Sequence, residues 1–361
     1  MTGMRSVSPP QYGKRRVAII IPRLALLGPV IVMQNLVNEI YNDRNLSLKL
    51  FYIDRKIDPG MDIGIQVERL NWTKFSYEDF DIIHTSGLRP DLFAFLYRKK
   101  IKYYISTIHN YVFDDLKYEY GPVISKIFGN IWIWLWKRAD RLVCVSDALR
   151  QYYSRWFMQA KMTVIHNGIR HPVISSVSDF SIGNIVEKFH KKGLKVIGFV
   201  GMLNRRKGLD QLLHLISYEQ RFALIIIGDG KRRTELEKLS KNLRVTDRLY
   251  FCGFKRNVTD YFPFFDMFIM PSRSEGFGLA LIEAVQHKVP VICSDLAVFT
   301  ELFNCNEITF YERESIISLR SALITLCKEG EFKIEPAYQK FEKNYKSSIM
   351  SQKYLELYNS L

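Results

Sequence analysis

Short apolar runs alternate with longer helical segments along almost the whole chain. Residues 17–21 are apolar throughout and end at Pro22, and Gly28-Pro29 then opens a helical pattern over about residues 30–41, with the proline in its first turn. Uninterrupted runs of this length are typical of strands buried on both faces, and parallel strands need helical connections between them. The alternation therefore predicts an α/β fold with parallel sheets covered by helices.

The alternation occurs twice. Further strands of a first series are expected at residues 48–53, 82–84, 103–108 and 141–145. A second series is expected to have strands at 196–200, 222–227, 249–252, 267–270 and 289–293, and helices at 209–217, 232–242 and 279–286. A chain of 361 residues is also long for one hydrophobic core. Together these features predict two doubly wound, Rossmann-like domains.

A weakly patterned, serine-rich stretch separates the two series. One apolar run ends in an Asn167-Gly168 turn and residues 175–181 follow it, so we place a linker near residues 170–185. The last helical segment, about residues 336–361, is amphipathic and needs a surface to cover. The expected units are residues 1–175, residues 176–340 and a C-terminal helix over residues 341–361.

Two negative features of the sequence bear on cellular location. The five cysteines are widely spaced and form no Cys-x-x-Cys pair, so neither a disulfide framework nor a zinc site is indicated. The apolar run after the polar N-terminus is too short for a signal-peptide core or a membrane span. We expect a protein of the reducing cytoplasm.

The segment 271–284 is the most specific signal for chemistry, because it joins an expected strand to an expected helix through two glycines. Gly276 and Gly278 allow close approach of the backbone to a ligand, and a helix starting near Gly278 offers free N–H groups and a positive dipole end to a diphosphate. Glu275 and Glu283 flank this turn, and each carboxylate is able to accept two hydroxyl hydrogen bonds from a sugar ring. The alternative is structural: Glu275 as a helix-capping acid and Glu283 as a solvated helix residue.

The same segment resembles the Glu-x7-Glu motif of the retaining group 1 (family 4 type) nucleotide-sugar glycosyltransferases, which have the GT-B fold. The resemblance implies two Rossmann-like domains facing a cleft, with the acceptor on the first, the donor on the second, and a C-terminal helix that crosses back to the first domain. It also implies that Glu275 lies at the donor sugar as a catalytic residue and that Glu283 binds the ribose. Backbone amides of the turn, at Gly276, Phe277, Gly278 and Leu279, are expected to hold the donor phosphates.

Residues 198–209 form a second signal, a strand end followed by a basic turn. They are similar to the family segment that supplies a diphosphate-binding Arg and Lys, which implies that Arg206 and Lys207 neutralise the leaving diphosphate. Met202 stands where many members of that family have Arg. The resemblance therefore implies that Arg205 or Arg206 supplies the positive charge that Met202 lacks. A surface charge run is the structural alternative.

Three further positions match family elements. Phe254 follows a short strand end that resembles the family's contact with the nucleotide base, and a core aromatic residue is the alternative. His109 ends a Thr-x-His run that resembles the family element beside the donor sugar, which makes it the second catalytic candidate against a purely structural histidine. Gly28 resembles the loop after the first strand that approaches the donor phosphate. Ser146 is interpreted as a helix cap and Asn167 as a turn residue.

The charge balance bears on partners. Fifty-two Lys and Arg against 37 Asp and Glu give a formal charge of +15, which serves solubility or attracts anions such as sugar nucleotides, acidic phospholipids and nucleic acid. No RNA-binding aromatic motif, zinc-finger spacing or arginine-rich tail is present, so we expect no nucleic acid partner. The run Ile131-Trp132-Ile133-Trp134-Leu135-Trp136 precedes two basic residues and indicates either core packing or peripheral contact with an anionic membrane at the cytoplasmic face of the inner membrane.

The combined expectation is a retaining hexosyltransferase that uses a UDP- or GDP-sugar and a glycan or lipid-linked oligosaccharide acceptor, in the synthesis of a bacterial O-antigen or capsule. No Asp-x-Asp stands in a loop suited to a metal-bound diphosphate, so we expect no metal and no other cofactor. The implied route is a same-face displacement in which the departing phosphate accepts the acceptor's proton. A sugar-nucleotide epimerase of GT-B fold and a non-catalytic sugar-nucleotide-binding subunit are the alternatives.

Overall fold

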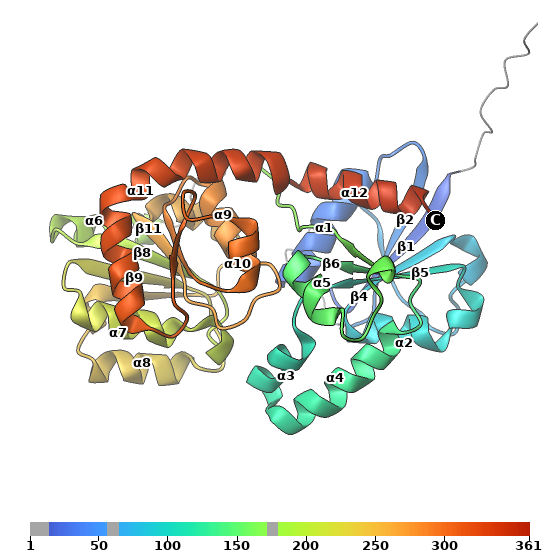
Figure 1. Ribbon diagram of the computed structural model, residues 1–361, viewed down its shortest axis with the longest axis horizontal. Helices are drawn as coiled ribbons and strands as arrows, with labels where there is room; N and C mark the ends of the chain where they lie inside the picture. The colour runs from blue at the N-terminus through green and yellow to red at the C-terminus, as the bar shows by residue number, and fades with distance from the viewer. Residues whose placement is uncertain (1–13, 56–64, 172–179) are drawn as a thin grey trace, which may run out of the picture.

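The computed structural model describes residues 14–55, 65–171 and 180–361, which form two α/β domains side by side (Figure 1). The first domain contains a parallel sheet of seven strands in the order β3-β2-β1-β4-β5-β6-β7. Its strands are β1 (Arg15–Ile21), β2 (Leu46–Tyr52), β3 (Val67–Arg69), β4 (Ile82–Ser86), β5 (Tyr103–Ile108), β6 (Arg141–Cys144) and β7 (Met162–Val164). Its helices are α1 (Gly28–Ile40), α2 (Leu88–Leu96), α3 (Val112–Tyr120), α4 (Pro122–Trp136) and α5 (Asp147–Tyr153).

The second domain repeats this architecture with a parallel sheet of six strands in the order β10-β9-β8-β11-β12-β13. Its strands are β8 (Lys195–Val200), β9 (Phe222–Ile227), β10 (Leu249–Gly253), β11 (Met267–Met270), β12 (Val291–Ser294) and β13 (Thr309–Tyr311). Its helices are α6 (Phe180–Lys191), α7 (Leu209–Tyr218), α8 (Arg233–Asn242), α9 (Leu279–Gln286), α10 (Ala297–Leu302) and most of α11 (Ile316–Asn344). Short 3₁₀ turns are η1 (Tyr77–Asp79), η2 (Arg98–Lys100), η3 (Gln159–Lys161), η4 (Arg205–Lys207), η5 (Thr246–Arg248) and η6 (Val258–Phe264).

The central strands are buried on both faces, as their uninterrupted apolar sequences require. All of Val17–Ile21 and all of Phe222–Ile227 are 1% exposed or less, except Phe222 at 3%. In each domain the strand order reverses beside the first strand, β1 or β8, so the loops that follow these strands open toward the same cleft. The predicted fold class, two doubly wound domains facing a cleft, is confirmed.

The prediction of one terminal helix from about Pro336 is wrong in its bounds. Helix α11 begins at Ile316, passes through Pro336 and ends at Asn344; Lys346 is extended, and α12 (Ser347–Asn359) follows. Figure 1 shows α11 running along the second domain and α12 lying on the first. There Tyr354 and Tyr358 anchor α12 by hydroxyl hydrogen bonds to Thr107 Oγ1 (3.0 Å) and His84 Nδ1 (2.6 Å). The C-terminal helix thus crosses back to the first domain.

The expected linker near residues 170–185 needs a second correction. Residues 180–185 belong to α6, where Ser181, Gly183 and Asn184 weaken the helical signal of the sequence, and residues 172–179 lie outside the described part of the chain. Strands β3 and β13 were not predicted, because three residues are too few to carry a periodic signal. Among the described residues, none of the helices combines the length and the apolar character needed to cross a bilayer.

Candidate active site

A cavity of about 440 Å³ lies between the two domains, at the carboxyl ends of their central strands. The first domain contributes the loop after β1, the start of α1 and the segment after β5; the second contributes the turn before α9, the turn after β8 and the loop after β10. Ligands of doubly wound sheets bind at this edge. All residues predicted for catalysis or donor binding line this cavity.

The glycine turn before α9 brings the two domains into contact. Gly278 has φ +95°, and a Cβ built there would lie 2.5 Å from the Phe299 ring, so a side chain is excluded both by backbone strain and by space. A Cβ on Gly276 would lie 1.9 Å from the carbonyl oxygen of His109 in the other domain. Ser146, the N-cap of α5, also donates to the Gly276 carbonyl (2.9 Å). The turn therefore needs glycine to pass between the domains and present the N-terminus of α9 to the cavity.

Glu275 is buried and engaged by the two predicted cations. Lys207 Nζ donates to Glu275 Oε1 (2.6 Å), and Arg206 Nη1 lies 3.1 Å from Oε2. Ser272 Oγ also donates to Oε1 (2.8 Å). Burial raises the pKa of this carboxyl, but Lys207 and Arg206 outweigh that effect and hold the pKa at about 2. Glu275 is therefore an anion at any physiological pH, and it fixes both cations at the cavity wall.

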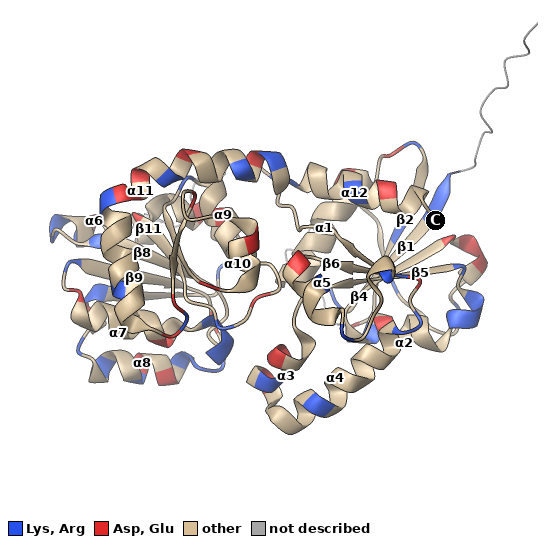
Figure 2. Ribbon diagram, viewed as in Figure 1, with Lys and Arg blue, Asp and Glu red and all other residues tan. Residues whose placement is uncertain are grey.

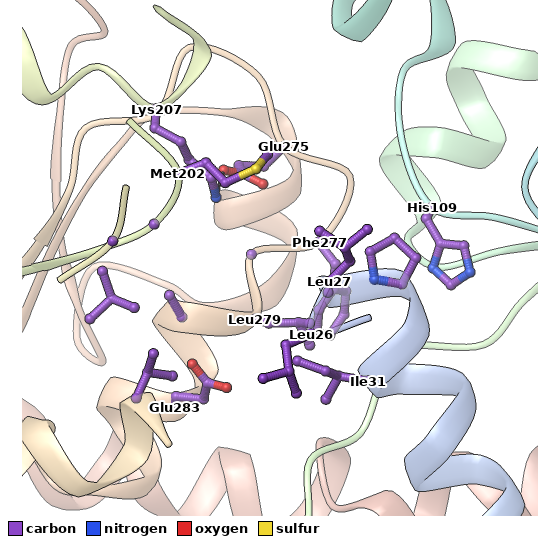
Figure 3. A pocket seen from close by; sticks show the side chains of 18 of the residues that line it. Leu26, Leu27, Ile31, His109, Met202, Lys207, Glu275, Phe277, Leu279 and Glu283 are labelled. Carbon is purple, nitrogen blue, oxygen red and sulfur yellow. Dashed lines mark hydrogen bonds and ion pairs between the residues drawn. The ribbon is translucent and has the colours of Figure 1, made fainter. Parts of the chain in front are cut away.

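Glu283 lies one turn into α9, on the other side of the cavity from Glu275 (Figure 3). Within the described part of the chain, its carboxylate has no hydrogen-bond or ion-pair partner. Burial raises its pKa to about 7, even though the Lys207 charge acts in the opposite direction. A carboxyl in the cavity wall that accepts no hydrogen bond from the described protein is suited to accept hydroxyl hydrogen bonds from a ligand.

His109 extends from the end of β5 toward the cavity, opposite the glycine turn (Figure 3). Its Nε2 shares a 3.0 Å hydrogen bond with Ser86 Oγ. Burial lowers its pKa to about 4, so the ring is neutral near pH 7 and acts there as a hydrogen-bond partner rather than as a cation.

The other predicted residues differ in what they present to the cavity. Gly28 is the first residue of α1, and a Cβ there would lie 3.3 Å from Leu279 Cδ1 of the opposite domain. Phe254 is 58% exposed at the cavity wall, so it is not the core aromatic residue of the structural alternative. Phe277 is only 3% exposed and its ring packs on His166 and Tyr345, so the ring belongs to the core beside the cavity.

Of the two arginines that the sequence offers in place of an arginine at position 202, only Arg206 reaches the cavity among the described residues. Met202 lines the cavity, as does Arg206, whereas Arg205 is exposed and does not line it. Arg206 also donates to the Ser274 carbonyl (2.8 Å), which holds its guanidinium between the basic turn and the Glu275 loop. Among the described residues, no group of three or more His, Cys, Asp or Glu side chains is placed to hold a metal ion.

Asp115 on α3 is a cavity residue that the sequence did not indicate. Asn110 Nδ2 donates to its Oδ2 (2.6 Å), while its buried Oδ1 accepts no hydrogen bond and lies 3.5 Å from Arg206 Nε. Burial raises the pKa of this carboxyl despite the nearby Arg206 charge. In the sequence Asp114-Asp115 looks like an ordinary acidic first helical turn, and only the packing of α3 against the second domain places Asp115 at the ligand site.

Glu301 is a second residue that sequence reasoning missed. It projects from α10 of the second domain and accepts hydrogen bonds from the backbone N–H groups of Asp147 (2.7 Å) and Ala148 (2.8 Å). Its Oε1 also lies 2.8 Å from Nε2 of His166. One carboxylate thus ties the second domain to the start of α5 and to the end of the first-domain sheet.

Family comparisons agree with this geometry. Residues 183–347 match the family described as Glycosyl transferases group 1, and residues 53–171 match that described as Glycosyltransferase Family 4. The O-antigen biosynthesis glycosyltransferase WclY of Escherichia coli is 33% identical over 362 residues, which cover 96% of this chain and 98% of that protein. The chain belongs to the group 1 glycosyltransferases. Another relative, the O-antigen biosynthesis glycosyltransferase WbnH of E. coli, is 29% identical to this glycosyltransferase over 55% of each chain.

Solved structures give the fold of this glycosyltransferase. Anabaena HepE in complex with UDP superimposes with a TM-score of 0.80 at 16% identity, over 96% of this chain and 100% of that one. The lipopolysaccharide outer core galactosyltransferase WaaB, in its apo form, has a TM-score of 0.67 at 16% identity and covers 96% of this chain and 100% of that one. The fold is GT-B.

Proposed function

We propose that this glycosyltransferase moves a hexose-type sugar from a UDP- or GDP-sugar to a glycan or lipid-linked acceptor, with retention at the anomeric carbon and without a metal, in the synthesis of a bacterial surface polysaccharide. The polysaccharide role is supported by relatives named for O-antigen biosynthesis. The donor class is supported by the charges and free hydrogen-bonding groups of the cavity.

The observation that carries the proposal is the order of groups along the cavity wall. Glu283, whose carboxyl has no partner among the described residues, lies on one side of the α9 N-terminus. The cluster of Glu275, Arg206 and Lys207 lies on the other. A nucleotide sugar has the matching order: a ribose diol, a diphosphate and a hexose. The diphosphate then meets the helix N-terminus and the two cations, while each sugar ring meets one acid.

The proposed reaction forms a bond between the acceptor oxygen and C1 of the donor sugar and breaks the bond between C1 and the phosphate oxygen. The acceptor's proton passes to the departing β-phosphate oxygen, and the nucleoside diphosphate leaves. Lys207, Arg206 and the start of α9 stabilise the negative charge that develops on the leaving group. His109 and Glu275 orient the donor sugar from opposite domains, and the contact between the domains excludes water that would hydrolyse the donor.

A ligand panel followed by product analysis tests the proposal. UDP-, GDP-, ADP- and dTDP-sugars are compared by thermal shift, because a ligand that binds the native state raises its unfolding temperature. The stabilising donor is then supplied with bacterial lipid-linked glycans, and NMR reports the anomeric configuration of the new linkage in excess EDTA. A retained configuration in EDTA is expected; an inverted product, or activity restored only by Mn²⁺, contradicts the mechanism.

Two outcomes of the same experiment select the alternatives. Isomerisation of the free nucleotide sugar without an acceptor identifies an epimerase. Nucleotide-sugar binding without turnover on any acceptor identifies a non-catalytic subunit. As a matched pair of variants, Lys207→Ala is expected to weaken donor binding and Lys191→Ala is not, because Lys191 is exposed on α6 and pairs with the exposed Glu187.

A further inference from the structure

The outer face of α4 exposes a row of large apolar side chains. Six residues of this helix are each between 40% and 70% exposed: Val123, Ile124, Ile127, Phe128, Ile131 and Trp134. Their spacing of three and four residues places them on one side of the helix, and α2 adds the exposed Leu92 and Leu96 beside them. We call these eight residues the α4 surface. Figure 1 shows α4 at the periphery of the first domain, with α3 as its neighbour.

The inner face of α4 is held to the domain by hydrogen bonds, so the orientation that exposes the apolar row is fixed. Trp132 Nε1 (2.7 Å) and Trp136 Nε1 (2.8 Å) both donate to Oδ2 of the fully buried Asp91. Trp134 lies between them in sequence and faces outward, with its ring centroid 4.0 Å from that of Phe95. Two of the three tryptophans therefore pack against the core, as the first alternative from the sequence requires, and the third lies at the surface.

The charges on α4 and on the two residues that follow it are all positive, whereas the neighbouring α3 carries acidic residues. Helix α4 contains no Asp or Glu, and its one charged residue is the exposed Lys126. The exposed Lys137 and Arg138 follow its C-terminus, and the Arg138 guanidinium lies 4.5 Å from the centroid of the Phe95 ring. Figure 2 shows α4 as largely uncharged apart from these basic positions. An apolar face with an outward tryptophan, bordered only by cations along its own helix, has the composition of a helix that lies in a membrane interface.

We propose that the α4 surface binds the surface of an anionic lipid bilayer. A second copy of this chain is a poorer match, because a symmetric dimer presents the same patch from both subunits and would bring the cations of one α4 toward those of the other. Phosphate head groups neutralise these cations, and the acyl boundary accepts the apolar row. Lipid binding itself does not depend on which sugar is transferred.

The α4 surface and the cavity are joined by one helical hairpin. Ser125 Oγ on α4 donates to the Phe113 carbonyl on α3 (2.6 Å), and α3 carries Asp115 in the cavity wall. A bilayer under α4 therefore lies on the domain expected to hold the acceptor. This placement suits the lipid-linked acceptor of the proposed function, and that part of the inference rests on the proposed function.

Vesicle flotation tests the binding. The full chain is mixed with vesicles of phosphatidylethanolamine and phosphatidylglycerol, or of phosphatidylcholine alone, at low ionic strength. We expect flotation with the anionic vesicles, and release as salt is raised. The double variant Ile127→Glu/Phe128→Glu is expected to lose binding by a factor on the order of tenfold or more, because two inserted apolar groups become charged. Lys126→Ala/Lys137→Ala is expected to weaken binding about fivefold for each cation removed.

A matched control exists on the other domain. Ile317 and Phe332 of α11 are more exposed than any of the α4 residues, so Ile317→Glu/Phe332→Glu makes the same chemical change on another apolar surface and is expected to float like the wild type. Thermal unfolding and donor-induced stabilisation show that each variant is folded. The proposal is overturned by a wild-type protein that does not float, by an α4 variant that floats like the control, or by a lipid-free dimer that Ile127→Glu dissociates. Loss of flotation with transfer to a soluble acceptor intact separates this inference from the proposed reaction.

Discussion

Lys207 Nζ donates to Glu275 Oε1 over 2.6 Å, so a cation expected at the leaving phosphate is held by the acid expected at the donor sugar. Arg206 makes the same connection to the other carboxylate oxygen. A diphosphate that enters the cavity meets cations whose positions are already set, which reduces the reorganisation needed during transfer. In the proposed reaction, the pairing of Glu275 with Lys207 is therefore expected to contribute both to the fold and to catalysis.

The first prediction concerns Lys207→Ala. The change removes one donor to the leaving phosphate, and we expect kcat to fall by about a hundredfold or more. It also leaves buried Glu275 with Arg206 as its remaining cation, which is expected to lower the free energy of unfolding by about 1–3 kcal/mol. Steady-state kinetics and chemical denaturation measure the two effects. A variant with lowered stability and undiminished kcat would show that Lys207 is structural only.

The second prediction concerns the pH dependence of donor binding through Glu283. The ionised carboxylate accepts both hydrogen bonds of a ribose diol, whereas the protonated form does not. Because burial raises the pKa of Glu283 to about 7, the acceptor form predominates only above that pH. Donor affinity is therefore expected to rise with pH and to level off above 7, with a loss of about tenfold per pH unit well below it.

Titration calorimetry between pH 5 and 9 measures this profile, and Glu283→Gln provides the control. The amide has the same shape and does not titrate, so its donor affinity is expected to be lower and independent of pH in this range. A wild-type profile that is flat through pH 7, or a variant that keeps the wild-type slope, would assign the pH dependence to another group.

The third prediction concerns Asp115→Asn, which preserves shape and removes charge. The asparagine oxygen still accepts the hydrogen bond from Asn110, so we expect the unfolding midpoint to change little. The anionic oxygen beside Arg206 is lost, and we expect kcat/KM for the acceptor to fall about tenfold, as for the loss of one charge-assisted contact. Donor affinity, measured separately, is expected to stay within a factor of about three. Unchanged kcat/KM would show that the charge of Asp115 has no role in transfer.

The longer strands, and the positions of the two acids at the glycine turn, were predictable because their signals are local. An apolar run such as residues 222–227 identifies a buried strand by itself. Glu275 and Glu283 lie close together in the sequence, in the glycine turn and in the helix that follows it. The cavity role of Asp115 was not predictable, because it depends on packing between elements far apart in the chain. Which α4 tryptophans face the core depends likewise on Asp91, some 40 residues earlier, because its carboxylate accepts hydrogen bonds from Trp132 and Trp136 on one face of the helix.

The fourth prediction concerns the contact between domains at Glu301. Its carboxylate accepts the Asp147 and Ala148 N–H groups and pairs with His166, so Glu301→Ala leaves two backbone donors of α5 without their partner. Hydrogen bonds to charged groups of this kind stabilise a protein by about 1.5–3 kcal/mol, and we expect a loss of that order in the free energy of unfolding. Glu335→Ala is the matched control, because Glu335 is exposed and its partners Lys288 and Gln339 are exposed side chains rather than backbone groups of the other domain.

The same variant tests whether this contact holds the domains together during transfer. Loss of the Glu301 bridge is expected to speed hydrogen exchange at the Asp147 and Ala148 amides and to increase hydrolysis of the donor relative to transfer, since water then enters the cavity more often. Both quantities are compared with those of Glu335→Ala at a temperature where each protein is fully folded. Faster exchange with an unchanged ratio of hydrolysis to transfer would mean that the Gly276 contact with His109 is sufficient to exclude water without Glu301.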